Sequence, residues 1–519
     1  MRSANENADA TIRDEAADEA TRVSVPPPAE RAETALVPDY DGLYARATND
    51  PERFWMEVAR EIAWETNPTS ARTFAGDTTR WFVGGRGNLV SNCLDRHLHE
   101  SRRDKLALIW LGEDRAERRF TYGELHRLVC KFASGLKELG IGVGDHLCLL
   151  MPTTPEGLAA LLAAARLGAI TTIASAGAGA AGLRAQIDAT SAKLIITADV
   201  AAGHGEGTTL RSLVGQAIEG MATPPRLIVH RHEGATNASK GSGELDLADL
   251  LKGASPRCEP TIVDSEHPLF VLAAVTTDRK GDRGGDQGDD AEFVHGGYAV
   301  GTAYTTRIAY DLKDEDIYWP LGDNDWLASH PAALLGPLLN GATIVLRAGA
   351  AAASDSAGVW QTIARLGVTT LLATTPILRQ LLARDAAQPA TGELTTLRLL
   401  ICDGPPLTPD EWWRAYRQIL RGTGQLCANW WEPAMGTPVI GTLPSMVAKP
   451  GWLGKPFPGI RATIIEQAEG EQGVPGTGRL RFAGAWPQLA RNGGAAGGRA
   501  SVRAKQDGDG YLTLVGGTA

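Results

Sequence analysis

The stretch VTTDRKGDRGGDQGDDAEFVHGG, at 275–297, mixes residues that could hold a phosphate with residues that would repel one. It follows the apolar run PLFVLAA and precedes YAVGTAYTTRI, which favours a helix. A strand, a glycine-bearing loop and a helix are the usual parts of a phosphate cradle. The stretch nevertheless carries six acids, Asp278, Asp282, Asp286, Asp289, Asp290 and Glu292. Two interpretations stay open, a rewired phosphate loop or a solvated loop without a phosphate role, and the acids favour the second.

The composition of the chain limits the partners of any such site. The 519 residues carry a formal net charge of −10, so we expect no general attraction to nucleic acid or to an anionic membrane. The run LAALLAAARLGAI is too short to span a bilayer and contains Arg166, so it predicts a buried helix. Residues 1–30 lack the apolar core of a secretory signal, and the six cysteines show no Cys-x-x-Cys spacing. We therefore expect a cytoplasmic protein without a disulfide framework or a zinc site.

Helices and short strands alternate along the chain and would position the loops. FTYGELHRLVCKFASGLKELG and GLAALLAAARLGA have the character of helices, the first with a stop at Gly140. Strands are predicted at HLCLLMP, AITTIA, KLIITAD, RLIVH, PLFVLAAV, ATIVLRA, VTTLLATTP and LRLLICDG. This alternation predicts an α/β fold with parallel sheets covered by helices, in which loops at the carboxyl ends of strands bind ligands.

Many segments resemble the AMP-forming acetyl-CoA synthetases, a family of adenylate-forming acyl-CoA ligases. They occur in the family's order between Asp39 and Val515, and include NDPERFW, RWFVGGRGNLVSNCLDRHL, HGGYAVG, DIYWPLGDNDWLASH, GPLLNGATIVL, NWWEPAMG, GKPFPGI and AWPQLAR. The resemblance implies the family's large N-terminal domain, with helix-covered, mainly parallel sheets and a smaller β subdomain. We expect a disordered acidic tail over 1–37, an acetyl-CoA-synthetase-like N-terminal segment over 38–100 and the AMP-binding domain over 101–517. Because the sequence stops at Ala519, we expect the family's C-terminal lid and its lysine to be missing.

The resemblance implies that ATP and a short carboxylate form an acyl-adenylate, which then passes its acyl group to CoA. ATP with Mg²⁺ and CoA are therefore the cofactors implied by the family alone, and the residues themselves assign no cofactor. The family's phosphate loop corresponds to the acid-rich stretch, where its remnants are Thr276, Thr277, Lys280 and Gly281. The positions that contact the CoA 3′-phosphate correspond to Gly203 and Glu206, and a glutamate there would repel a phosphate.

The nucleotide pocket implied by the resemblance is also altered. The glutamate that lies near the metal is replaced by Ala434, and Glu432 could substitute for it only if the backbone shifted. The segment with the ribose-binding aspartate is missing after Arg491, so we assign Asp507 and Asp509 to a later turn. The remnants of the pocket are Gly404, Pro405, Pro406, Trp430 and Glu432.

The acyl pocket keeps more of the family's outline. Trp431 occupies the position whose indole caps the pocket and restricts it to very short acids, although plain core packing is the alternative. Its expected neighbours are Leu327, Ala328 and Asp403. Asp403 stands where the family has an apolar residue, and it would disfavour an acetate anion unless it is protonated or paired.

These departures favour a pseudoenzyme that keeps the fold and binds a small carboxylate, a nucleotide or a protein partner at the surface that the lid would cover. The first alternative is a residual AMP-forming ligase for a short acid such as acetate, with a lid supplied by another chain. The second is a gene product without a settled role. Neither nucleic acid nor a membrane is an expected partner.

Overall fold

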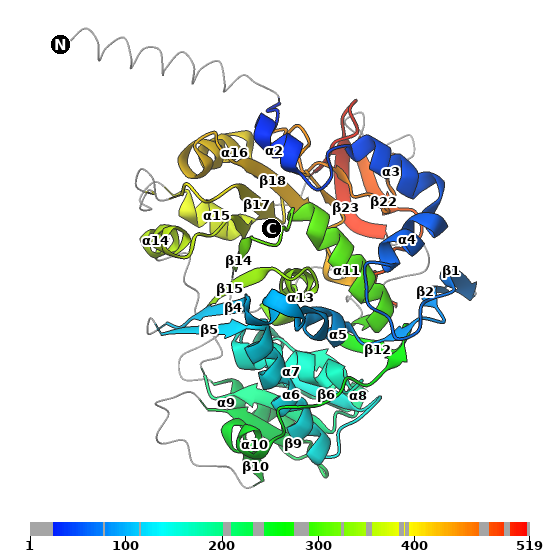
Figure 1. Cartoon of the computed structure of the whole chain (residues 1–519), viewed down its shortest axis with the longest axis vertical. Helices are drawn as coiled ribbons and strands as arrows, with labels where there is room; N and C mark the ends of the chain where they lie inside the picture. Colours follow the sequence, from blue (N-terminus) through cyan, green and yellow to red (C-terminus); the bar gives the residue numbers. More distant parts are fainter. Residues whose placement is uncertain are drawn as a thin grey trace, which may run out of the picture.

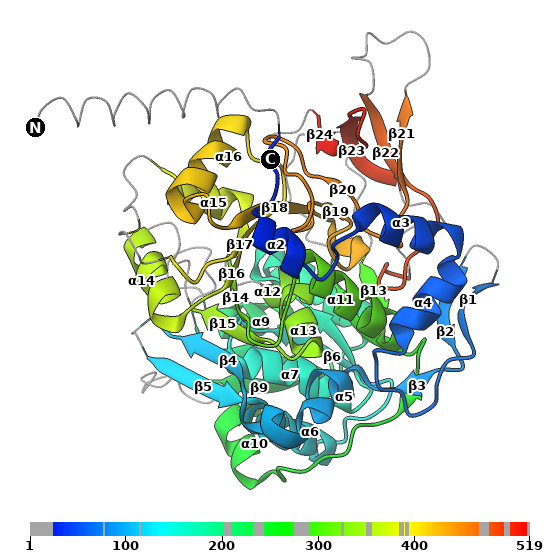
Figure 2. The same cartoon turned by 45° about the horizontal axis from the view of Figure 1, so that its top comes forward.

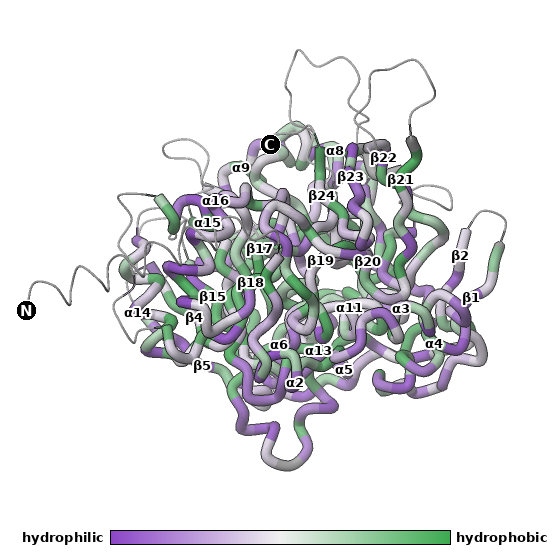
Figure 3. Tube along the Cα trace, turned by 90° about the horizontal axis from the view of Figure 1, so that it is seen from above, coloured by the Kyte–Doolittle hydropathy of each residue, from purple (hydrophilic) through white to green (hydrophobic). Residues whose placement is uncertain are grey.

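The computed structural model of the chain describes residues 24–75, 78–113, 116–200, 209–231, 243–273, 290–322, 326–348, 355–383, 389, 394–466, 477–491 and 499–515. Two large sheets with their covering helices make up most of the molecule, and α11 (His295–Ala309) runs between them (Figure 1). In Figure 3, hydrophobic segments gather along interior strands such as β18 (Gln425–Trp430), and hydrophilic segments are frequent along the outline. The α/β class with parallel sheets is confirmed.

A seven-stranded sheet has the order β10-β9-β8-β6-β7-β12-β13. All its neighbours pair in parallel except β12 and β13. The strands are β6 (His146–Leu150), β7 (Ile170–Ile173), β8 (Leu194–Ala198), β9 (Arg226–His230), β10 (Glu244–Asp246), β12 (Pro268–Leu272) and β13 (Ala291–Val294). Its helices are α6 (Tyr122–Glu138), α7 (Pro155–Arg166), α8 (Gly179–Thr190), α9 (Leu210–Ile218) and α10 (Leu247–Gly253). Each apolar run expected as a strand in this region is one, because both faces of the sheet are covered.

The end of the acid-rich stretch differs from the strand–loop–helix expectation. The segment AEFV at 291–294 forms β13, an antiparallel edge strand that pairs with β12, and α11 follows it directly. Ala291, Phe293 and Val294 are buried in this strand, so their apolar contacts add it to the sheet. Residues 274–289, with most of the acids, lie outside the described residues.

A nine-stranded sheet has the order β20-β19-β18-β17-β16-β14-β15-β4-β5, and β4, β15, β14, β16, β17 and β18 are parallel to one another. Its strands besides β18 are β4 (Leu106–Leu111), β5 (Glu117–Thr121), β14 (Ile317–Leu321), β15 (Thr343–Arg347), β16 (Thr370–Thr374), β17 (Leu399–Asp403), β19 (Ile440–Gly441) and β20 (Lys455–Pro456). Its helices include α12 (Trp326–Ser329), α13 (Ala332–Leu339), α14 (Ser356–Leu366), α15 (Thr375–Leu381) and α16 (Pro409–Ala415). Alternate residues of β17 belong to two separate hydrophobic clusters, one on each face of the sheet.

A smaller antiparallel sheet completes the fold (Figure 2). Its strands are β21 (Ala462–Glu466), β22 (Thr477–Phe482), β23 (Arg499–Gln506) and β24 (Leu512–Leu514). As expected, Asp507 and Asp509 belong to the turn before β24, where Lys449 Nζ lies 2.5 Å and 2.6 Å from their carboxylates.

The N-terminal region contributes α3 (Tyr40–Asn49), α4 (Pro51–Ala59) and the hairpin β1 (Ser70–Ala75)–β2 (Thr78–Val83). Within the region expected as a disordered tail, 1–37, the structure describes residues 24–37. They include α2 (Ala29–Thr34), the buried side chain of Val37 and backbone hydrogen bonds between Val25 and Ala448. Residues 1–23 lie outside the described part of the chain.

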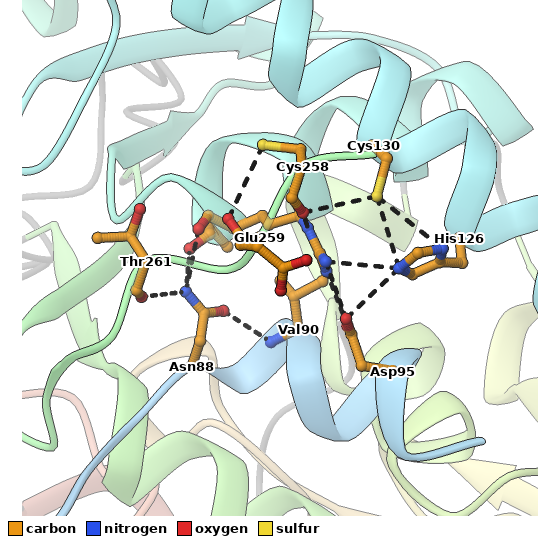
Figure 4. A network of polar contacts seen from close by, with 10 residues as sticks. Asn88, Val90, Asp95, His126, Cys130, Cys258, Glu259 and Thr261 are labelled. Carbon is orange, nitrogen blue, oxygen red and sulfur yellow. Dashed lines mark hydrogen bonds and ion pairs between the residues drawn. The ribbon is translucent and has the colours of Figure 1, made fainter. Parts of the chain in front are cut away.

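A buried polar network fixes α7 to its surroundings (Figure 4). The side chain of Arg166, at the end of α7, is 2% exposed and holds both carboxylate oxygens of Asp95 at 2.7 Å and 2.8 Å. Its Nε donates to the carbonyl oxygen of Cys258 at 2.5 Å. His126 Nε2 lies 3.4 Å from Asp95 and 3.5 Å from the sulfur of Cys130.

The helix α7 is buried along its length, as expected for the run LAALLAAARLGAI. Among the described residues, no helix is long and apolar enough to cross a bilayer.

We expect the His126→Gln variant to lose the alkaline part of the pH dependence of stability. Burial alone would lower the pKa of His126, but its contacts with Asp95 and Cys130 raise that pKa to about 9. Because the folded pKa is above the unfolded value, the stabilisation is complete below pH ~6.5 and is lost as the pH rises to about 9. The loss should be on the order of 2–3 kcal/mol in the wild type, measured as the free energy of unfolding between these pH values. An equal alkaline loss in the variant would contradict this assignment.

Candidate functional site

The carboxyl end of the parallel strands in the nine-stranded sheet is where an α/β fold places ligands. In register, Thr374 at the end of β16 pairs with Asp403 at the end of β17, and Asp403 pairs with Asn429 of β18. Paired residues of parallel strands point to the same face of a sheet. Asp403 and Asn429 therefore share one face at this edge.

Four aromatic side chains from separate segments form a connected group next to Asp403, which we call the aromatic cluster: Tyr310, Tyr318, His330 and Trp431. Tyr310 ends α11, Tyr318 lies in β14, His330 follows α12, and Trp431 follows β18. The rings of Tyr310 and Tyr318 stack with centroids 5.4 Å apart. Tyr310 Oη lies 3.4 Å from His330 Nε2, and the centroids of His330 and Trp431 are 3.7 Å apart.

Trp431 links the aromatic cluster to Asp403. Its indole N–H donates a hydrogen bond to Asp403 Oδ2 at 3.1 Å. Burial raises the pKa of both Tyr310 and Tyr318, and the negative charge of the nearby Asp403 raises both pKa values further. Asp403 and the four aromatic side chains therefore make one local site.

Burial controls the charges of this site. Asp403 is 5% exposed, and burial raises the pKa of its carboxyl to about 7, although the indole N–H of Trp431 opposes the rise. Burial lowers the pKa of His330 to about 3, so its ring is neutral at physiological pH. Asp403 Oδ1 and both amide atoms of Asn429 are buried and have no hydrogen-bond partner among the described residues. Such groups are costly unless a water or a ligand satisfies them.

The structure brings together some of the residues that were expected in the acyl pocket. Asp403 and Trp431 are in contact, as the resemblance implies. Leu327 and Ala328 lie in α12, which leads directly to His330, and Leu327 is fully buried. Trp431 is half-buried, and its indole N–H is hydrogen-bonded.

The expected nucleotide remnants lie at or just after the ends of β17 and β18. Trp430 turns away from Trp431 and stacks on Phe482 of the smaller sheet, with centroids 6.4 Å apart. Gly404 has a φ of +116° and donates its N–H to the carbonyl of Asn429, which fixes the turn after β17. The carbonyl of Pro405 accepts from Thr375 Oγ1 at 2.6 Å, whereas Pro406 is half-buried in the same turn.

The described residues around Glu432 do not fit a magnesium ion. Glu432 is half-buried, burial raises the pKa of its carboxyl, and Ala434 faces a hydrophobic cluster. Within the described ranges, no three His, Cys, Asp or Glu side chains are grouped to hold a metal ion. The phosphate-loop remnants Thr276, Thr277, Lys280 and Gly281, and the positions Gly203 and Glu206, lie outside the described residues.

A cleft of about 520 Å³ lies elsewhere, beside β2 and Arg491. Arg491 at its wall makes ion pairs with Glu266 at 3.3 Å and Glu292 at 3.0 Å. Because two carboxylates neutralise this guanidinium, the cleft presents no unpaired cation at that point. We therefore take the site at Asp403 as the stronger candidate.

Sequence reasoning missed Tyr310, Tyr318, His330 and Asn429. Tyr318 and His330 both belong to DIYWPLGDNDWLASH, a segment that carries the family resemblance. His330 is two residues from Ala328. Asn429 is two residues before Trp431 in NWWEPAMG. The available signal was that these residues are close in sequence to residues expected in the pocket. Residues that follow one another at the end of a strand often line the same pocket.

Comparison with known proteins supports the family and the fold. A model of the AMP-binding enzyme family matches residues 94–272 and 293–491, and a model of the acetyl-coenzyme A synthetase N-terminus matches residues 40–93. Acetyl-coenzyme A synthetase of Deinococcus radiodurans is 33% identical over 494 residues, covering 92% of this chain and 75% of that protein. The enzyme of the same name from Gemmatimonas aurantiaca is 35% identical over 475 residues, covering 90% and 71%.

Among solved structures, the acetoacetyl-CoA synthetase from Streptomyces lividans matches with a TM-score of 0.81. It covers 95% of this chain and 79% of the other, at 20% identity. An identity this low shows a shared fold alone.

Proposed function

The chain belongs to the acetyl-CoA synthetase family of AMP-binding enzymes, and from that premise we propose that it is a ligand-binding member that does not activate acetate. In this proposal it is a pseudoenzyme of the cytoplasm. Its task is to bind a small molecule at the candidate site, without turning it into an acyl-adenylate.

The observation that carries this proposal is the buried carboxyl of Asp403 beside Trp431. An acetate capped by Trp431 would lie next to Asp403, which is 5% exposed. Two carboxylates at such a distance cannot both stay ionised at low cost, and burial leaves little water to screen them. The site therefore disfavours the charged form of the acid that the reaction needs as a nucleophile, unless Asp403, whose pKa burial raises to about 7, takes up a proton.

Two features of the sequence add support. The match to the AMP-binding enzyme family stops at residue 272 and resumes at 293, which brackets most of the acid-rich stretch. The side chain of Ala434 has no oxygen that could bind a metal ion. Loss of one preorganised electrostatic group costs about 10²–10³ in rate, so the combined losses predict at least that much.

We expect no acetate-dependent exchange of pyrophosphate into ATP by the purified chain with Mg²⁺ present. The acetyl-CoA synthetase of Deinococcus radiodurans serves as the positive control for the assay. The rate should be at least ~10³-fold below that control, because an electrostatic group of the kind lost here is worth about that factor. A thermal unfolding curve on the same sample excludes a trivial loss through misfolding.

Exchange within about tenfold of the control, a difference smaller than the loss of one such group, would overturn the proposal. It would support the alternative, a residual AMP-forming ligase for a short acid. Propionate and butyrate, run in parallel, test whether a different acid is the substrate.

A further inference from the structure

We propose that Asp403 and the aromatic cluster bind a small organic ammonium ion. This inference rests on the proposed function, because it names the class of ligand that the same site would hold. The proposed ligand is a cation, whereas an ionised carboxylic acid is an anion.

The first argument is the missing counter-charge of Asp403. Two effects act on the pKa of its carboxyl, burial and the hydrogen bond from the Trp431 N–H. No arginine or lysine in the described residues contributes. Trp431 occupies Oδ2, whereas Oδ1 is buried without a partner in the same set of residues. A buried carboxylate requires hydrogen-bond donors and positive charge, and an ammonium group supplies both.

The second argument is the chemistry of the surrounding walls. Burial keeps Tyr310 and Tyr318 in the phenol form, and it keeps the ring of His330 neutral. The site thus has four neutral aromatic rings and one acid. Neutral aromatic faces attract cations, most strongly where water is excluded.

The third argument is the second acceptor on the same sheet face. Asn429 pairs in register with Asp403, is fully buried and has no partner for its amide oxygen among the described residues. A primary ammonium group has three N–H donors and so can use more than one acceptor. A neutral alcohol has a single donor and brings no charge, so it satisfies the site less well.

Three structural features hold these groups in place. Tyr318 lies inside β14, Asp403 and Asn429 occupy adjacent parallel strands, and Tyr310 ends the long buried helix α11. A site built on strands and a helix is formed before the ligand arrives, which lowers the entropic cost of binding.

Methylammonium chloride is the probe for the test, detected by saturation transfer from the protein to the methyl protons in NMR. We expect saturable binding with a Kd on the order of 10 mM, near the best that two non-hydrogen atoms can achieve. Sodium acetate and methanol, of similar size, should give no saturable signal. The Asp403→Asn variant keeps the side-chain volume and should weaken methylammonium binding by at least ~10-fold, because the charge-assisted bond is lost.

The control variant is Asp410→Asn, because Asp410 is an exposed acid at the start of α16 and should not affect binding. Asp403→Asn should fold, since it removes a buried charge, and a thermal unfolding curve checks this. In the wild type, binding should weaken as the pH falls below about 7, where Asp403 becomes protonated. The groups facing Asp403 (Tyr310, Tyr318, His330 and Trp431) do not change charge there.

Equal methylammonium binding by wild type and Asp403→Asn, a preference for acetate, or a signal that does not saturate would each overturn the inference. These outcomes are separable from failure of the proposed function. Absence of both acetate exchange and methylammonium binding rejects the ammonium site alone. Acetate exchange rejects the proposed function, whatever methylammonium does.

Discussion

Replacing Arg398 by methionine should lower the free energy of unfolding by about 3–5 kcal/mol, the cost of removing one partner from a buried ion pair. Arg398 Nη1 lies 2.7 Å from Asp311 Oδ2, and its Nε lies 3.0 Å from Asp316 Oδ1. The side chains of the two aspartates are 3% and 1% exposed, and that of Arg398 is 10% exposed. Burial opposes the charge of Arg398, but the two aspartates raise the pKa of its guanidinium. Methionine fills similar space without the charge, so the variant isolates the electrostatic loss.

The position of Arg398 also connects this pairing to the candidate site. Asp311 directly follows Tyr310, and Asp316 comes two residues before Tyr318. Arg398 precedes β17, the strand that ends at Asp403. The same variant should therefore reduce methylammonium binding, because it loosens the elements that carry three residues of the site.

Denaturant unfolding measures the effect, with Arg379→Met as the matched control. Arg379 pairs with Glu411 at 2.9 Å, but the two side chains are 44% and 24% exposed. An exposed pair of this kind is worth ~1 kcal/mol or less. Equal losses in the free energy of unfolding for Arg398→Met and Arg379→Met would show that burial does not explain the effect of Arg398.

Replacing Gly454 by alanine should cost at least ~4 kcal/mol, and soluble protein should be hard to obtain. Gly454 has a φ of +130°, and an added Cβ would lie 2.0 Å from the carbonyl oxygen of Gly441. That contact is with backbone, which cannot move aside without separating the segment from β19. Gly454 also exchanges backbone hydrogen bonds with Leu512 of β24, so the change would disturb the joint with the smaller sheet.

Gly422→Ala separates the cost of the backbone angle from the cost of the clash. Gly422 has a φ of +76°, yet an added Cβ would meet nothing within 4 Å. Its replacement should cost about 1 kcal/mol, the ordinary penalty for a side chain in the left-handed region. Thermal unfolding of both variants decides the point. A mild effect of Gly454→Ala, similar to that of Gly422→Ala, would argue against the close backbone approach.

The sequence by itself determined the family and many of the elements. Apolar runs such as HLCLLMP and LRLLICDG became β6 and β17, and the periodic segment before Gly140 became α6. These patterns are local, because a strand buried on both faces must be apolar throughout and a helix must repeat its apolar face. The motif GKPFPGI is recognisable in the sequence, but its glycine is explained only by the structure, since Gly454 is required by a backbone angle and a close approach to Gly441.

The tertiary structure alone decided which of the chemically capable residues meet. Asp403 and Trp431 were expected as neighbours through the resemblance, but the hydrogen bond between them and the contacts of His330 and Tyr310 depend on how separate segments pack. Adjacent Trp430 and Trp431 also have different surroundings, one on Phe482 and the other on His330. Charge was decided at this level as well, because burial sets the pKa values of Asp403 and His330, and no sequence pattern records how much water a fold excludes.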